Sequence, residues 1–232
     1  MDKSKVFSKN HSEIQALFEG VGGIFLWEIS KIIKISKNIK SIILDWDGVF
    51  TDGRKDQNKN STYSELDTMG LNMLRFGYWK LTKTVLPVFL VTGEENPTAW
   101  VVAERDRFSG VYFGVKNKSQ IDKNILDNFD VDISQSLFFF DDILDLSLVR
   151  KCVLTIGIPN LAMPLFREQQ IKEPNCCYLT GNGGEHHGIR EACEMLLGLW
   201  GNYNFVVENR SFYTAEYKDF LNQRNKIKPQ LF

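Results

Sequence analysis

The feature that most limits how this chain can fold is an alternation of short apolar runs with segments of helical pattern. Runs rich in β-branched and aromatic residues indicate strands, and the segments between them indicate helices. The predicted strands are 41–44, 85–91, 111–113, 137–140, 153–156 and 177–179. The predicted helices are 69–82, 97–108, 118–129, 145–150, 161–167 and 187–199. This rhythm predicts an α/β fold, a Rossmann-like parallel sheet with helices on both faces.

Three parts of the chain differ in pattern. Residues 1–40 form a predicted N-terminal helical extension, in which apolar residues recur at near-helical spacing. Residues 41–199 carry the alternation and form the main domain. Residues 200–232 form a C-terminal extension, with a predicted helix at 213–224 and a frayed end.

Two interpretations of the N-terminal extension stay open. Glycines divide its apolar pattern, so we expect two short helices. These helices can pack onto the main domain, or they can present an apolar face to a membrane surface or a partner. The first interpretation is favoured, because amphipathic helices usually face a core.

Charge and composition argue against several kinds of partner. The chain of 232 residues has 28 Lys and Arg against 29 Asp and Glu, a net charge of -1. That near-balance argues against nucleic acid or a membrane held by bulk electrostatics. No apolar stretch approaches the roughly 18 residues of a membrane span, and no secretory signal is evident. The four cysteines have no zinc-binding spacing, so we expect reduced thiols in a cytoplasmic protein.

Acidic residues follow the first predicted strand. Asp45 and Asp47 come directly after an apolar run, where carboxylates are costly unless they are paired or bound to a metal. A turn at Gly48 would let both carboxylates reach one site and present a backbone carbonyl. That geometry suits a nucleophile, an acid/base and a cation ligand together.

Three further predicted strands also end in polar residues. Thr92 follows the second strand, where a hydroxyl before Gly93 can hold a phosphoryl oxygen. Lys118 begins a helix after the third strand, where a bound anion would explain a lysine that opposes the helix dipole. Asp141 and Asp142 follow the fourth strand and suggest a site for a hard cation. Ligands bind at the carboxyl ends of strands in open α/β sheets, so these groups are expected at one edge.

These motifs, in this order, resemble the haloacid dehalogenase (HAD) superfamily of phosphohydrolases. Response-regulator receivers use similar residues, but there the acidic pair comes first, whereas here it comes last. At finer grain, residues 45–53, 141–145 and 183–193 resemble the branch that includes 3-deoxy-D-manno-octulosonate (KDO) 8-phosphate phosphatase. The resemblance spans roughly 41–199. It implies a HAD-like fold with a small flap and no large cap domain, and the polar segment 51–67 fits such a flap or hairpin.

The resemblance also implies catalytic roles. Asp45 would be the nucleophile that forms an aspartyl-phosphate, and Asp47 would act as general acid and base. Thr92 and Lys118 would bind the transferring phosphoryl oxygens. The reaction would be hydrolysis of a phosphomonoester.

The cofactor implied by the resemblance is Mg²⁺. Asp45, the backbone carbonyl of Asp47 and Asp141 would hold it, with Asp142 in support. Asp145 would lie behind the ligands or only orient the loop. The branch commonly assembles as a tetramer, in which the flap and a neighbouring subunit close the site, so a homo-oligomer is expected.

Substrate recognition is less sharply indicated. Glu94 follows Gly93 where octulosonate phosphatases usually carry Arg, which resembles phosphatases of nine-carbon keto-sugar acid 9-phosphates; a helix N-terminal acid is the plainer interpretation. Asp67 and Gly70 match the family's Arg-Asp-Gly-x-Gly segment, although Leu66 and Thr68 beside them do not. Arg190 would meet a substrate carboxylate from a neighbouring subunit, or pair with an acid on its own helix.

A second hypothesis comes from a different class of function. Phe140 stands where the family usually has Gly, and its larger side chain is a candidate to crowd the metal loop. Phe140, the altered segment at 66–68 and the two extensions together motivate this hypothesis. It is that the chain is a HAD-like binding or assembly module with weak or no catalysis, associated with nucleotide-sugar synthesis. His186 and His187 are expected to be loop residues, because an adjacent pair lacks metal-ligand spacing.

Overall fold

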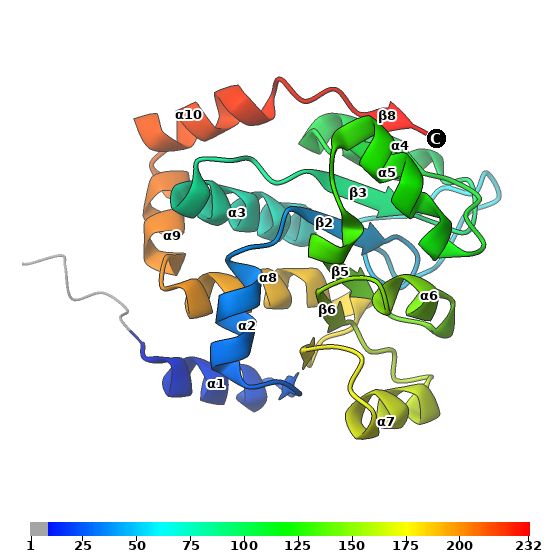
Figure 1. Ribbon diagram of the computed structural model, residues 1–232, viewed down its shortest axis with the longest axis horizontal. Coiled ribbons are helices and arrows are strands. Elements are labelled where there is room, and N and C mark those ends of the chain that lie inside the picture. Colours follow the sequence, from blue (N-terminus) through cyan, green and yellow to red (C-terminus); the bar gives the residue numbers. More distant parts are fainter. Residues whose placement is uncertain (1–8) are drawn as a thin grey trace, which may run out of the picture.

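The computed structural model describes residues 9–232, and residues 1–8 of the predicted N-terminal extension lie outside that range (Figure 1). One sheet runs through the described chain in the order β1-β7-β6-β5-β2-β3-β4-β8. Every neighbouring pair is parallel except β1 with β7. The strands are β1 (Ile24–Phe25), β2 (Ser41–Asp45), β3 (Val88–Val91), β4 (Gly110–Tyr112), β5 (Ser136–Phe140), β6 (Leu154–Gly157), β7 (Tyr178–Leu179) and β8 (Gln230–Leu231).

Helices cover both faces of this sheet, which confirms the predicted α/β class. The α-helices are α1 (His11–Gly20), α2 (Ile29–Ser36), α3 (Glu65–Thr82), α4 (Pro97–Asp106), α5 (Asp122–Phe129), α6 (Leu146–Val149), α7 (Pro164–Lys172), α8 (Gly188–Trp200), α9 (Tyr203–Ser211) and α10 (Ala215–Arg224). Short 3₁₀ turns are η2 (Lys118–Ile121), η3 (Ile133–Gln135), η4 (Ile143–Asp145) and η5 (Gly184–His186). Helix α7 begins and ends later than the predicted 161–167.

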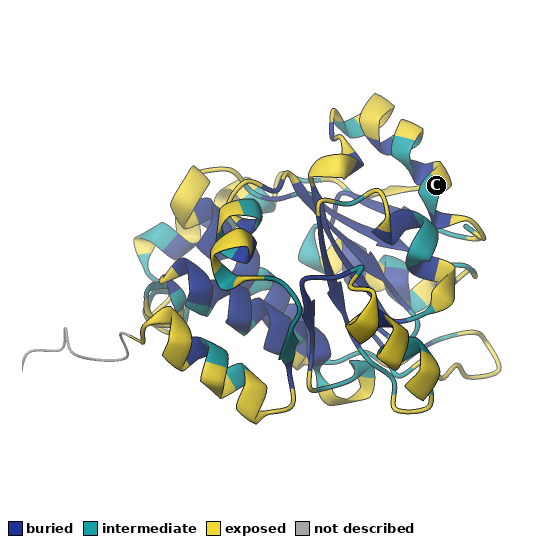
Figure 2. Ribbon diagram, turned by 60° about the horizontal axis from the view of Figure 1, so that its bottom comes forward, coloured by how far each residue is buried: buried dark blue, intermediate teal, exposed yellow. Residues whose placement is uncertain are grey.

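The central strands are buried on both faces, as Figure 2 shows by their dark colour. Strand β5 pairs in parallel with β2, and β2 pairs with β3. Alternation then divides the side chains of β5 between two cores: Phe139 lies in the first and Phe138 in the second. Because neighbouring strands are parallel, β2, β3 and β5 all end at one edge of the sheet.

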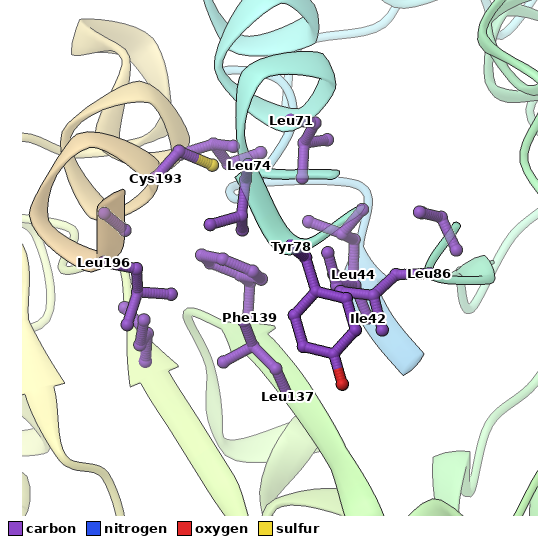
Figure 3. Close-up of a cluster of buried hydrophobic side chains, with 14 of the residues drawn as sticks. Ile42, Leu44, Leu71, Leu74, Tyr78, Leu86, Leu137, Phe139, Cys193 and Leu196 are labelled. Atoms are coloured by element: carbon purple, nitrogen blue, oxygen red, sulfur yellow. The ribbon is translucent and has the colours of Figure 1, made fainter. Parts of the chain in front are cut away.

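The larger core lies between the sheet and helices α3 and α8 (Figure 3). Leu44 and Phe139 from the strands face Leu74 of α3 and Leu196 of α8, and all four side chains are fully buried. Burying an apolar side chain of this size contributes about 2 kcal/mol. The smaller core, on the opposite face, packs side chains of α5 and α6 against the strands.

The N-terminal extension packs onto the main domain. The two expected short helices are α1 and α2, and Ile14 and Ile32 bury their side chains in the larger core beside α8. Between the helices, β1 adds an antiparallel edge strand to β7. The described part of the extension is therefore continuous with the sheet and its core. No helix among residues 9–232 is long and apolar enough to span a bilayer.

The predicted frayed C-terminal end was wrong. Gln230 and Leu231 pair with β4 as strand β8, and the Phe232 ring stacks on Tyr112 at 4.8 Å. A two-residue strand has no periodicity to detect in sequence. Helix α10 matches the predicted helix 213–224, whereas α9 was not predicted; Figure 1 shows both beside α3.

The flap is irregular and shorter than predicted. Residues 51–64 contain no strand, and α3 begins at Glu65 because the Ser64 side chain accepts a hydrogen bond from the Leu66 N–H at 3.0 Å. Residues 65–67 of the predicted flap thus belong to the helix. Within the described residues, no domain-sized insertion follows β2 or β3, as the resemblance implies.

A buried arginine ties α3 to the neighbouring loops. Arg75 is 1% exposed and donates hydrogen bonds to the backbone carbonyls of Leu86 at 3.1 Å, Asp106 at 2.8 Å and Arg107 at 3.1 Å. Burial lowers the pKa of Arg75 to about 9. Two of these carbonyls end α4, so one guanidinium caps that helix from inside the fold.

We expect Arg75→Met to lower the free energy of unfolding by about 3 kcal/mol, because three buried carbonyls lose their donor. Lys80→Met on the same helix is the matched control. Its exposed ion pair with Glu216 at 3.4 Å contributes less than about 1 kcal/mol. Urea unfolding followed by circular dichroism measures both; equal losses in the two variants would contradict the role of Arg75.

Candidate active site

The loop after β2 turns sharply at Gly48. The glycine has a φ of +92°, and a Cβ there would lie 2.0 Å from Oδ2 of Asp141. Only glycine permits both the conformation and the approach. The predicted turn is therefore present, and it brings the loop after β2 against the acidic loop after β5.

Three carboxylates meet at this edge of the sheet. Oxygens of Asp45, Asp141 and Asp145 all lie within 4.8 Å of one another. Oδ1 of Asp141 is buried and accepts no hydrogen bond from the described residues. Clustered carboxylate oxygens with an unsatisfied buried atom are the donor set that a hard divalent cation prefers. The residues present therefore fit the metal that the resemblance implies.

Lys118 supplies the positive charge beside this cluster. It is 4% exposed, and its Nζ donates to Oδ1 of Asp45 and, at 2.5 Å, to Oδ1 of Asp145. Turn η2, which follows β4, places it there. Burial opposes its charge, but the two carboxylates outweigh burial and raise the pKa of Lys118 above its ordinary value.

The carboxylates outnumber this lysine. Burial raises the pKa of Asp45, and the charge of Asp145 adds to the rise while Lys118 opposes it. Burial together with Asp45 and Asp145 raises the pKa of Asp141 further. Both pKa values rise because burial and the mutual repulsion of the three carboxylates disfavour the charged forms.

The acids of the β5 loop have different contacts. Oδ2 of Asp145 accepts the backbone N–H groups of Asp141 at 3.2 Å and Asp142 at 3.3 Å. Asp145 therefore orients the loop, as one of the two expected roles has it, and also contacts Lys118, which the sequence did not indicate. The side chain of Asp142 accepts the N–H of Ile143 and caps η4, so it stands apart from the group of three.

Asp47 contacts a residue that the sequence did not indicate. Its Oδ2 lies 2.8 Å from Nζ of Lys55 in the flap, while its Oδ1 is buried without a hydrogen-bond partner in the described chain. Lys55 was missed because a lysine in a polar loop has no distinguishing pattern. The only available signal was its position in the flap that follows the acidic motif.

Thr92 and its neighbours lie at the end of β3, the strand that pairs with β2. Thr92 is buried at the end of β3, and its Oγ1 accepts the N–H of Glu94 at 3.3 Å. Nζ of Lys116 donates to the Gly93 carbonyl at 2.9 Å and to Glu94 at 2.6 Å. The hydrogen bond and charge of Lys116 lower the pKa of Glu94. Glu94 is thus paired with a lysine.

Phe140 leaves the acidic loop free. Its ring lies in the smaller core, 6.2 Å from the ring of Phe138 and 6.5 Å from that of Phe166. The pleat of β5 points the side chain into that core. Crowding of the metal loop by Phe140 is therefore not observed.

Asp67, Gly70 and Arg190 meet where α3 packs on α8. Oδ1 of Asp67 accepts the N–H of Arg190 at 2.9 Å, and the guanidinium of Arg190 binds Glu194 at 2.8 Å. A Cβ on Gly70 would lie 3.0 Å from Cα of Arg190, so glycine allows the close packing. Of the two alternatives for Arg190, the pairing with an acid on its own helix is the one observed.

The two histidines lie in the loop before α8, as expected. His187 has its Nδ1 3.3 Å from Asp67, and His186 has its Nδ1 3.4 Å from Glu185. Within residues 9–232, the group able to hold a metal contains three aspartates and no histidine.

Known proteins resemble this chain in sequence and in fold. No protein-family model matches the chain. The KDO 8-phosphate phosphatase of Escherichia coli K12 is 28% identical over 172 residues, which cover 72% of this chain and 83% of that protein. A HAD superfamily (subfamily III A) hydrolase from Legionella pneumophila superposes with a TM-score of 0.64 at 20% identity, over 79% of this chain and 96% of the other.

A second solved structure is that of the KDO 8-phosphate phosphatase from Moraxella catarrhalis, in complex with a magnesium ion, a phosphate ion and KDO. It superposes with a TM-score of 0.60 at 20% identity, over 79% of this chain and 99% of that one. The chain therefore has the fold of solved hydrolases of the HAD class and is similar in sequence to a phosphatase. Within that class, the chain resembles the KDO 8-phosphate phosphatases.

We expect a divalent metal to raise the midpoint of thermal unfolding. A hundredfold excess over Kd corresponds to about 2.7 kcal/mol of stabilisation. Asp141→Asn loses this rise because it removes the carboxylate with the bare oxygen, whereas the control Asp142→Asn keeps it. Differential scanning calorimetry with and without MgCl₂ measures the shift, and equal shifts in the two variants would refute the assignment of Asp141.

Without metal, stability is expected to fall as the pH rises from about 5 to about 8. The pKa values of Asp45 and Asp141 are raised, so over this range the folded protein retains protons that the unfolded chain releases. Their contribution is present at low pH and is lost as the pH rises through the folded pKa values. Asp141→Asn should flatten this dependence, measured by thermal unfolding in EDTA; an unchanged slope would contradict it.

Proposed function

We propose that this protein is a Mg²⁺-dependent phosphomonoester hydrolase that cleaves a sugar-acid phosphate through an aspartyl-phosphate intermediate. One observation carries the proposal: three carboxylates and a buried lysine meet at the carboxyl edge of the sheet, with Thr92 at the adjoining strand end. A carboxylate nucleophile, a metal-binding acid and a phosphate-binding cation are the groups that such a transfer needs.

Asp45, Asp141 and the backbone carbonyl of Asp47 would hold the metal, whereas Asp142, expected from the resemblance to support it, caps η4 and would lie outside the ligand set. When bound, Mg²⁺ neutralises charge on the phosphate that an anionic nucleophile must approach. Lys118, which is positively charged, lies beside Asp45 and holds that carboxylate in place through its hydrogen bond.

The protein residues then divide the chemistry. An oxygen of Asp45 attacks phosphorus as the ester P–O bond breaks, and Asp47 gives its proton to the leaving sugar oxygen. Lys118 and the Thr92 hydroxyl bind phosphoryl oxygens as charge develops on them. Water, losing a proton to Asp47, next attacks the aspartyl-phosphate, and this step frees Asp45 and inorganic phosphate.

The substrate class is proposed from the relatives. The named relatives act on KDO 8-phosphate, which supports KDO 8-phosphate or a nine-carbon keto-sugar acid 9-phosphate. Gly93 and Glu94 lie beside Thr92 and favour the longer acid by resemblance. Asp67, Gly70 and Arg190 would contribute through the packing of α8, because their observed contacts are with one another and with Glu194.

Assembly as a homotetramer is also proposed from the resemblance. Leu161 and Leu165, which lie between β6 and the first turn of α7, are 88% and 82% exposed. Exposed leucines of this kind are the surface that a neighbouring subunit would cover.

We expect Asp45→Asn to lower the rate of phosphate release by at least about 10³-fold, because an amide cannot serve as the nucleophile. Asp142→Asn, whose capping role an amide can preserve, is the control and should keep most activity. Release of inorganic phosphate from eight- and nine-carbon keto-sugar acid phosphates, with and without MgCl₂, is the measurement.

The alternative of a binding or assembly module predicts a different outcome. It gains support if the wild-type protein with Mg²⁺ releases no phosphate across the substrate panel. The observed packing of Phe140 away from the acidic loop removes one of the reasons for that alternative.

A further inference from the structure

The flap lysine Lys55 stands apart from the other charged residues of the flap. Its Nζ is 2.8 Å from Oδ2 of Asp47, and the two side chains are 24% and 28% exposed. Arg54, the preceding residue, pairs with Asp52 at 3.8 Å and is 91% exposed. A half-buried pair at hydrogen-bonding distance holds its geometry better than a solvated one.

The flap is built to hold Lys55 in place. Directly after it, the Asp56 carboxylate accepts the N–H groups of Asn58 at 2.8 Å and Asn60 at 2.9 Å, which closes a tight turn. At its far end, Ser61 is fixed to the start of α4 by a hydrogen bond from Asn96 at 2.9 Å. On the other side of Lys55, the N–H of Arg54 donates to Oδ1 of Asp52 at 2.9 Å, so hydrogen bonds hold the chain both before and after Lys55.

The two oxygens of Asp47 have different surroundings. Oδ2 faces Lys55, while Oδ1 is enclosed and has no hydrogen-bond partner in the described chain. A lysine that holds one oxygen fixes the rotation of the carboxyl group. It leaves the other oxygen for a group that the protein itself does not supply.

We propose that Lys55 is a positioning residue for the phosphatase reaction, and that it orients Asp47 so that Oδ1 faces the leaving oxygen of the substrate. The inference rests on the proposed function, since it acts through the general acid. In the first step the proton on Oδ1 moves to the leaving oxygen as the P–O bond breaks, while Lys55 donates its hydrogen bond to Oδ2.

The proposal makes the effect of Lys55 depend on the leaving group. 4-Nitrophenolate leaves without a proton, whereas phenolate and alkoxides need one. We therefore expect Lys55→Met to lower kcat for phenyl phosphate by at least about tenfold, and to change kcat for 4-nitrophenyl phosphate by less than about threefold.

Matched variants separate positioning from charge. Lys59→Met removes the same charge from the same flap, and among the described residues Lys59 has no ion pair with Asp47, so its kcat ratio should equal that of the wild type. Lys55→Arg should restore most of the ratio. In an Asp47→Asn background, Lys55→Met should add no further loss with phenyl phosphate.

Three results would overturn the proposal: equal loss of kcat for both aryl phosphates, a change in KM alone, or an additive loss in the Asp47→Asn background. Thermal unfolding of each variant checks that the fold is retained. The proposed function is judged separately by the wild-type protein: if it hydrolyses neither aryl phosphate nor any sugar phosphate with MgCl₂, the function fails before Lys55 is tested.

Discussion

Repulsion among carboxylates at one sheet edge is the constraint on which the site depends. Two like charges 4 Å apart repel by about 4 kcal/mol at an effective dielectric constant of 20. Lys118 relieves part of this repulsion by contacting both Asp45 and Asp145. One lysine does not neutralise three carboxylates. Asp141 keeps a buried oxygen that has no hydrogen-bond partner among residues 9–232. The folded protein therefore holds excess negative charge at this edge, which protons or a bound cation must neutralise.

The fold can hold these carboxylates close together because the centre of the sheet is rigid. Strands β2 and β5 are buried on both faces, and residues 41–44 pair with residues 136–139, so the loops that follow start from fixed points. Gly48 then lets the two loops approach, and Asp145 holds the second loop by its backbone N–H groups. Apolar packing on the faces of the sheet offsets the free-energy cost of crowding the acids at its edge.

Sequence was sufficient wherever a pattern repeats or a strand end carries an unusual residue. The six predicted strands, the turn at Gly48 and the gathering of Asp45, Lys118 and Asp141 at one edge could all be inferred from periodicity and topology. Strand β8 could not, because two residues have no period and their pairing with β4 depends on chain segments distant in sequence. Long-range contacts of this kind have no local signal.

Partners rather than residue types decide what each aspartate does, and this is why the site was only partly predictable. Asp142 and Asp141 are adjacent and chemically identical, yet one caps a turn while the other keeps a bare oxygen against the loop of Gly48. Asp47 likewise is distinguished by Lys55, a flap residue of no detectable pattern. The motif specifies where the charges lie, and the tertiary contacts specify which oxygens remain free. A short flap that brings Lys55 to Asp47 can thus assign a role that the acidic motif alone leaves open.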